Sequence, residues 1–230
     1  MTDTIPDEPL GSHVLELQIV DVVAETQDAR SLVFAVPDGA EIPAERLRYA
    51  PGQFLTLRIP SERTGSVARC YSLCSSPFTD DALTVTVKRT ADGYASNWLC
   101  DHAHPGMRIH VLAPSGNFVP KTLDDDFLLL AAGSGITPVM SICKSALSKG
   151  GGQVTLVYAN RDERSVIFAD ALREVSHNPV VYAELPGAQH CFDVMPTART
   201  AATVEAIDRF LTFVHSTTSR EAAVAAGSRR

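Results

Sequence analysis

The sequence predicts a β plus α/β fold: an antiparallel β-barrel followed by a short parallel α/β domain. Between residues 13 and 121, short segments of alternating apolar residues are separated by Pro-Asp-Gly, Pro-Gly and Asp-Gly turns. After the acidic linker 122–126 the alternation is lost, and two apolar runs flank a Gly-Ser-Gly turn and a segment of helical period. The change of pattern places a domain boundary near residue 121.

The totals exclude several classes of protein. The chain has 230 residues, of which 45% are apolar, which is enough for one large domain or two small ones. A net charge of -7 argues against nucleic acid or an anionic membrane as the main partner. The polar N-terminal residues contain no apolar signal region, so we expect a cytoplasmic protein. The five cysteines, an odd number without a Cys-x-x-Cys motif, are expected to be reduced and packed.

The barrel elements follow in order along the chain. Residues 1–12 are short of apolar side chains and are expected to be disordered. The strands expected after them are 14–20, 31–36, 53–59, 69–74, 83–88, 107–112 and 117–119. One short helix, about 95–102, interrupts them.

The second domain, 122–176, begins with residues 127–132, which are apolar without alternation, as expected of a parallel strand covered on both faces. A helix over 138–148 and a strand over 154–159 complete a βαβ unit typical of nucleotide-binding layers. The elements expected after it are a helix over 166–175, a strand over 180–185 and a helix over 200–215.

The run Arg69-Cys70-Tyr71-Ser72 carries a cation, an aromatic ring and a hydroxyl in one strand. A flavin dinucleotide needs all three, because its pyrophosphate suits a bidentate cation, its ring suits a flat partner and its ring heteroatoms accept and donate hydrogen bonds. Alternation places Arg69 and Tyr71 on one face of the strand and Ser72 on the other. On these residues alone an edge strand with a surface arginine is the simpler interpretation, and the neighbouring segments favour the flavin.

Two neighbouring segments add possible cofactor contacts. Gly93 begins a helix whose first N–H groups and positive dipole end suit a phosphate, to which Ser96 would add a hydroxyl. Val87 and Lys88 end the preceding strand, where a cation would favour a reduced, anionic ring; a solvated strand end is the alternative.

The turn Gly133-Ser134-Gly135, with Thr137 and a proline after it, lies between a strand and a helix. This is a phosphate-cradling geometry, although two glycines are not the full dinucleotide fingerprint. Arg161 follows the next strand, where a side chain decides whether a ribose hydroxyl or a 2′-phosphate is read, and it could favour NADPH. No metal site is predicted, because Asp-His-Ala-His at 101–104 lacks a third clustered ligand.

Together these motifs resemble the ferredoxin-NADP reductase family over residues 13–173. The resemblance implies FAD contacts from Arg69, Cys70, Tyr71 and Ser72, with the arginine on the pyrophosphate, and from the strand backbone at Val87 and Lys88. It further implies that the loop 133–137 receives the pyridine nucleotide, with its threonine beside the nicotinamide. Tyr71, Ser72 and Thr137 are then positioning residues, since no side-chain acid or base is required.

Within that family the chain is most similar to reductase components of Rieske-type oxygenases, and residues 85–120 and 127–147 resemble those of 3-ketosteroid 9α-hydroxylation. The resemblance implies an enzyme that passes electrons from NAD(P)H through FAD to a [2Fe-2S] acceptor of an oxygenase, in a steroid-degrading system. The choice between NADH and NADPH, the acceptor and the oligomeric state stay open.

The family pattern stops after about residue 173. The [2Fe-2S] ligands that similar reductases carry with Cys-x4-Cys-x2-Cys spacing do not occur in this sequence. Residues 177–230 resemble instead the end of an α/β-hydrolase esterase, in which His190 would match the catalytic histidine. The sequence contains no Gly-x-Ser-x-Gly nucleophile motif. A reductase joined to a foreign tail, by recombination or a faulty gene model, would have a truncated nucleotide domain. The alternative function is therefore a flavin-binding remnant with little turnover.

Overall fold

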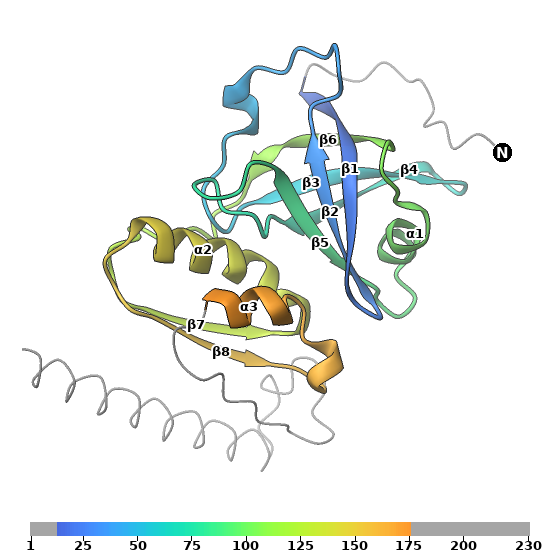
Figure 1. Cartoon of the computed structure of the whole chain (residues 1–230). Helices are drawn as coiled ribbons and strands as arrows, with labels where there is room; N and C mark the ends of the chain where they lie inside the picture. The colour runs from blue at the N-terminus through green and yellow to red at the C-terminus, as the bar shows by residue number, and fades with distance from the viewer. Residues whose placement is uncertain (1–12, 176–230) are drawn as a thin grey trace, which may run out of the picture. The chain divides into compact units, whose positions relative to one another are not determined.

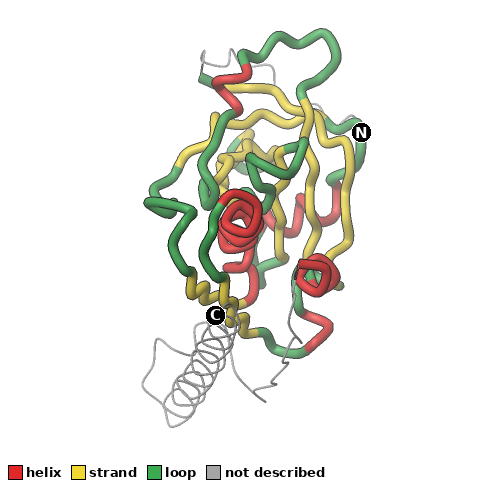
Figure 2. The backbone as a smooth tube through the Cα atoms, turned by 60° about the vertical axis from the view of Figure 1, so that its left-hand side comes forward, coloured by secondary structure: helices red, strands yellow, loops and turns green. Residues whose placement is uncertain are grey.

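The structure is a computed structural model, and it describes residues 13–175. Its first part is a six-stranded antiparallel sheet in the order β4-β3-β6-β1-β2-β5, whose strands curve around a common interior (Figure 1, Figure 2). The strands are β1 (Val14–Thr26), β2 (Ala29–Ala35), β3 (Phe54–Ser61), β4 (Gly65–Ser72), β5 (Leu83–Lys88) and β6 (Arg108–Ser115).

The two outer strands of this sheet meet and close the barrel. Leu73, directly after β4, forms an antiparallel bridge with Val85 of β5, and the Cys74 N–H donates to the Thr84 carbonyl at 2.9 Å. Because the sheet is closed, it encloses a single core. Every second residue of each strand points into this core. The largest fully buried side chains of this core are Phe34, Leu17, Ile19, Leu32, Leu55, Leu57, Ile59, Leu73, Leu99 and Ile109.

A single α-helix, α1 (Tyr94–His102), belongs to the barrel. It packs through the buried Leu99 and the half-buried Trp98 against the barrel core. The Arg89 guanidinium, at the end of β5, forms an ion pair with Asp101 near the end of the helix. The Tyr94 hydroxyl donates to the Pro60 carbonyl of β3 at 2.7 Å. The helix is therefore tied to two strands of the barrel.

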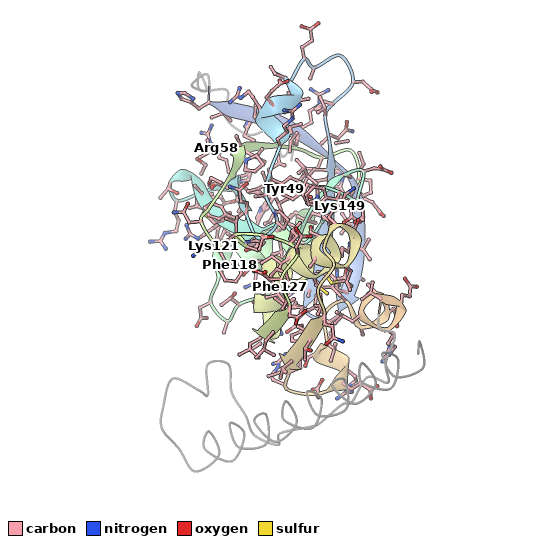
Figure 3. All side chains as sticks on the ribbon, turned by 90° about the vertical axis from the view of Figure 1, so that its left-hand side faces the viewer. Tyr49, Arg58, Phe118, Lys121, Phe127 and Lys149 are labelled. Carbon is pink, nitrogen blue, oxygen red and sulfur yellow. The ribbon has the colours of Figure 1, made fainter. Side chains whose placement is uncertain are left out.

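The second part is a parallel α/β unit. β7 (Phe127–Ala132) pairs with β8 (Val154–Ala159) in register from Phe127 to Ala132, and α2 (Ile136–Lys149) connects them. The linker that leads into it from the barrel passes Phe118 and Lys121 before it reaches Phe127 (Figure 3). After β8 comes α3 (Ala169–Val175). The parallel pairing confirms the predicted βαβ unit.

The α/β unit shares its core with the outer surface of the barrel. Ala29 and Cys74 of the barrel are buried together with Ile136, Ile167 and Phe168. Polar contacts surround this shared core. Ser141 of α2 donates to the Ser75 carbonyl at 2.6 Å, Ser145 lies 2.9 Å from Ser76, and Lys144 pairs with Asp80 at 3.0 Å.

Several sequence-based expectations are corrected. Within residues 13–175, β7 is covered on one face only: Leu129 is buried under α2, but Leu128 and Leu130 on the other face are 49% and 59% exposed. Residues 117–119 form a loop instead of a strand, because β6 ends at Ser115 and the chain leaves the barrel there. Cys70 is exposed, since β4 has no covering element over its middle. The helix expected from 166 begins at Ala169, after a short 3-10 turn capped by Asp162.

Two features are absent from residues 13–175. No helix there is long and apolar enough to cross a membrane. Within the same residues no three His, Cys, Asp or Glu side chains are grouped as metal ligands would be. The expected strand 180–185, the expected helix 200–215 and His190 lie outside the described residues.

Candidate functional site

The middle of β4 is open to a ligand. Ala68, Arg69 and Cys70 are consecutive and all exposed, so both faces of the strand can be approached. Pairing with β3 places Arg69 opposite Leu57 and Tyr71 opposite Leu55, which puts the arginine and the tyrosine on the same face, as the alternation predicts. The Arg69 guanidinium donates to the Ala68 carbonyl at 2.8 Å, and its remaining donors can reach a phosphate.

Tyr71 is half-buried at the edge of the barrel core. Burial raises the pKa of its phenol to about 12, and the neighbouring Cys100 adds to the rise while Arg69 opposes it. The phenol is therefore neutral at physiological pH, where it offers a flat apolar face and one O–H donor. The Cys100 thiol donates to the Val87 carbonyl at 3.7 Å, so Tyr71 and β5 meet at this point.

β4 and β5 diverge beside Tyr71. Among the described residues, one bridge, Leu73 to Val85, joins the two strands, so the edge of β5 beyond Val85 is not paired to β4. On its other edge β5 pairs with β2, with Val87 opposite Arg30 and Lys88 opposite Ala29. The register with β2 directs the backbone groups of Thr86 and Lys88 to this unpaired edge, where they can hydrogen-bond a ring held between the strands, whereas the Val87 carbonyl accepts from Cys100.

The start of α1 forms a tight turn close to β5. A Cβ on Gly93 would lie 2.8 Å from the Ser96 Oγ and 2.9 Å from the Thr90 Cβ, so only glycine fits there. The Ser96 hydroxyl accepts from the Thr90 N–H at 3.1 Å and donates to the Gly93 carbonyl at 3.2 Å. Ser96 thus shapes the turn, and the first N–H groups of the helix, which have no acceptor within it, are left for a phosphate.

The turn Gly133–Gly135 joins β7 to α2 and contacts β5. Gly133 has a φ of 50°, a left-handed conformation that favours glycine, and its carbonyl accepts from the Tyr158 hydroxyl at 2.8 Å. Thr137 is buried, and its hydroxyl donates to the Ser134 carbonyl at 3.0 Å. The expected nucleotide loop therefore lies next to the strand that would hold the flavin, braced by a tyrosine from β8.

Arg161 follows β8, and its guanidinium lies 3.0 Å from the Asp28 carboxylate in the β1–β2 turn. Lys88 lies 3.9 Å from the same carboxylate. Two cations that the sequence suggested for different cofactor contacts therefore share one counter-ion. Burial raises the pKa of Asp28, but the Thr26 hydroxyl, Lys88 and Arg161 together hold it below its usual value.

Three contributors to the site were not predicted from the sequence. Asp28 is an ordinary turn residue by its position, and Tyr158 lies inside an apolar strand. Glu25 accepts from Ser31 at 2.6 Å and from the Phe168 N–H at 3.3 Å, and so links the barrel to α3. The contacts of Asp28 with Arg161, of Tyr158 with Gly133 and of Glu25 with Phe168 join residues that are distant in the chain, so local patterns carry no sign of them.

Comparison with known proteins gives a consistent result. The oxidoreductase FAD-binding domain family matches residues 16–119, and the oxidoreductase NAD-binding domain family matches residues 129–190. The ferredoxin reductase component of 3-ketosteroid-9-alpha-monooxygenase from Mycobacterium tuberculosis is 83% identical over 179 residues, which cover 76% of this chain and 50% of that protein. The glycine betaine monooxygenase reductase subunit from Chromohalobacter salexigens is 32% identical over 180 residues, 76% of this chain and 45% of that protein.

Among solved structures, phthalate dioxygenase reductase superposes with a TM-score of 0.61 at 28% identity, covering 69% of this chain and 47% of that one. The present chain spans about half the length of the relatives that it matches. The two domain matches, the relatives and the barrel followed by a βαβ unit agree with one another. The chain belongs to the ferredoxin-NADP reductase-like family of oxidoreductases, with an FAD-binding domain followed by an NAD-binding domain.

Proposed function

We propose that this protein is an FAD-dependent electron-transfer oxidoreductase that passes electrons from NAD(P)H to a [2Fe-2S] acceptor of an oxygenase system. FAD, when bound, supplies the conversion of a two-electron hydride into single electrons. The described residues fit this group, because β4 carries an exposed cation and a half-buried phenol, and the turn that begins α1, close to β5, admits only glycine.

The side chains act by binding and orienting. Arg69 holds the pyrophosphate with the N–H groups that begin α1, and Tyr71 offers its flat face to the ring. Ser72 and the backbone at the end of β5 hydrogen-bond the ring. Thr137 closes the turn that includes Gly133 through its bond to the Ser134 carbonyl. None of these groups needs to gain or lose a proton, and the raised pKa of Tyr71 keeps its phenol neutral.

The observation that carries the proposal is the contact between the Gly133–Gly135 turn and β5. Hydride transfer requires the nicotinamide and the flavin ring to stack within a few ångströms, with the reacting atoms roughly 3–3.5 Å apart. A nucleotide loop that lies beside the flavin strand supports such a transfer, because it brings together the two elements that would hold the reacting rings.

The relatives suggest the system in which the protein works. One is named as the ferredoxin reductase component of a 3-ketosteroid monooxygenase, and phthalate dioxygenase reductase is described as a modular structure for electron transfer from pyridine nucleotides to [2Fe-2S]. We infer an iron-sulfur or Rieske-type oxygenase component as the partner, a steroid as the final substrate of that partner, and the cytoplasm as the location.

A second candidate function rests on β7. In a doubly wound sheet the first strand is central and the nucleotide binds where the strand order reverses. Leu128 and Leu130 are 49% and 59% exposed, and no element within residues 13–175 covers this face of β7, which favours an incomplete nucleotide domain. Such a protein would bind FAD and accept hydride slowly.

Anaerobic titration of the purified, FAD-loaded chain with NADH separates the two candidates. Stoichiometric bleaching of the flavin absorbance, followed by reduction of an added [2Fe-2S] ferredoxin, is the result expected of the reductase. A yellow protein that NADH fails to bleach, while dithionite does, would support the remnant. A colourless protein that takes up no FAD would contradict both.

A further inference from the structure

We propose that Asp28 is a specificity-determining residue of the nucleotide site, because it forms an ion pair with Arg161 and so makes the site discriminate against a 2′-phosphate. This inference rests on the proposed function, since it assumes that the adenosine of a pyridine nucleotide binds beyond the carboxyl end of β8. The residue comes from the barrel, 133 positions before Arg161, and outside the nucleotide domain itself.

Arg161 is the cation to expect on a 2′-phosphate. It follows β8, which ends at Ala159, and ligands of parallel α/β sheets bind at this end of the strands. A guanidinium suits a phosphate because its planar fork donates two parallel hydrogen bonds. In the structure, however, the Nη2 of Arg161 donates to the Oδ2 of Asp28 at 3.0 Å, and the Nζ of Lys88 lies 3.9 Å from the same oxygen, so Asp28 offsets part of the charge of both cations.

Asp28 is held firmly in place. The Thr26 hydroxyl donates to its Oδ1 at 2.8 Å, which leaves Oδ2 for Arg161. Its backbone carbonyl accepts from the Arg89 N–H at 2.8 Å. The carboxylate is thus fixed by its own turn and by the end of β5, and Arg161 is oriented toward it.

Electrostatics then disfavours a 2′-phosphate in two ways. A phosphate that binds Arg161 must compete with a carboxylate that is already bound, and it would lie within several ångströms of that negative charge. A ribose hydroxyl meets neither cost, because it is neutral and can donate to a carboxylate. The same pairing that docks the α/β unit onto the barrel therefore favours the unphosphorylated ribose.

The residues on either side of Arg161 also disfavour a 2′-phosphate. Asn160 Oδ1 and Asp162 Oδ1 are buried, and neither accepts a hydrogen bond from the described residues. Oxygens without a hydrogen-bond partner are stabilised by donors, and a 2′-phosphate brings further acceptors and further negative charge. Apart from Arg161, the segment 160–162 thus contains acceptors and no cation, and the next cation along the chain is Arg164.

The test compares 5′-AMP with 2′,5′-ADP, two probes that differ only in the 2′-phosphate, on the FAD-loaded full chain by titration calorimetry. In Asp28→Asn, which keeps an acceptor for Thr26, the Kd of 2′,5′-ADP should fall about three- to tenfold, while that of 5′-AMP stays within about twofold. In the double variant with Arg161→Gln the gain should vanish. Glu45→Gln, which removes one charge from an exposed site of the barrel, should change neither Kd.

A second variant tests the Arg161–Asp28 ion pair without altering Asp28. Arg161→Gln alone should leave the Kd of 2′,5′-ADP within about twofold, because the guanidinium is already occupied; a loss of tenfold would show that it serves the phosphate and would overturn the proposal. An unchanged 2′,5′-ADP affinity in Asp28→Asn, or an equal gain for 5′-AMP, would overturn it as well. The proposed function is tested separately, by anaerobic titration of the unaltered, FAD-loaded chain with NADH. It fails if NADH does not bleach the FAD.

Discussion

The barrel and the α/β unit cover the apolar faces of their strands in different ways. The barrel closes its sheet through Leu73 and Val85, and its own side chains fill the interior. The α/β unit has two described strands, and its core includes Ala29 and Cys74 from the barrel. The barrel core is thus complete without the α/β unit, whereas the α/β unit takes part of its core from the barrel. Loss of the α/β contacts should therefore spare the barrel, but damage to the barrel should disorder both.

The largest expected effect is a difference in the free energy of unfolding between two leucine-to-alanine variants, one in each region. Leu17 is 1% exposed inside the barrel, and Leu130 is 59% exposed on β7. Leu17→Ala should lower the free energy of unfolding by about 2–5 kcal/mol, because a buried side chain leaves a cavity. Leu130→Ala should change it by about 0.5 kcal/mol or less. Urea unfolding followed by circular dichroism measures both, and equal losses would mean that β7 is packed as tightly as the barrel core.

The next effect concerns cofactor binding by the barrel alone. Arg69→Gln removes the exposed cation on β4 while keeping a polar side chain. A hydrogen bond to a charged group contributes about 1.5–3 kcal/mol, so the Kd of FAD should rise roughly 10- to 150-fold. Fluorescence titration of the apoprotein measures this change. Arg63→Gln, in the exposed β3–β4 turn, is the matched control, and a similar loss there would show that general charge, and not Arg69, attracts the cofactor.

A smaller effect should loosen the α/β unit without touching the barrel. Ser141 is fully buried in α2, and its hydroxyl donates to the Ser75 carbonyl at 2.6 Å. Ser141→Ala leaves that carbonyl without this partner, at a cost of about 1–2 kcal/mol. Amide hydrogen exchange should accelerate in α2 and stay unchanged in β1 to β6. Ser148→Ala, on the exposed end of the same helix, should have no effect, and faster exchange throughout the barrel would contradict the comparison.

The same contrast explains how much could be predicted from the sequence. The barrel strands and the Arg69 to Ser72 run were predictable, because alternation along a strand is a local pattern and Tyr71 takes its face from it. The exposed face of β7 was not, because FLLLAA reads the same whether one or both faces are covered. The contacts of Arg161 with Asp28 and of Glu25 with the Phe168 N–H were not predictable either. Both join the barrel to the α/β unit across more than a hundred residues, and no local pattern records such a pairing.

The smallest expected effect is the pH dependence of the Asp28 contact between the two regions. The net pKa of Asp28 in the folded protein is below its ordinary value of 3.8, because the rise caused by burial is outweighed by Thr26, Lys88 and Arg161. A carboxyl group of this kind stabilises the fold above its unfolded pKa, and this contribution is lost as the pH falls through the lower folded pKa. Because the pair with Arg161 is partly exposed, its contribution should be about 1 kcal/mol or less.

Asp28→Asn should therefore be slightly less stable than the unaltered chain at pH 7, and the difference should shrink as the pH falls below about 4. Urea midpoints measured from about pH 7 to about pH 3 give this difference directly, with Glu45→Gln as the control for the loss of one negative charge. A difference that grows toward acid pH would mean that the folded protein holds Asp28 in its protonated form, which is incompatible with an ion pair to Arg161. A constant difference would place the effect in the turn that Thr26 closes. The two regions would then be joined by their apolar core, the serine contacts of α2, the Lys144–Asp80 pair and the bond from the Phe168 N–H to Glu25.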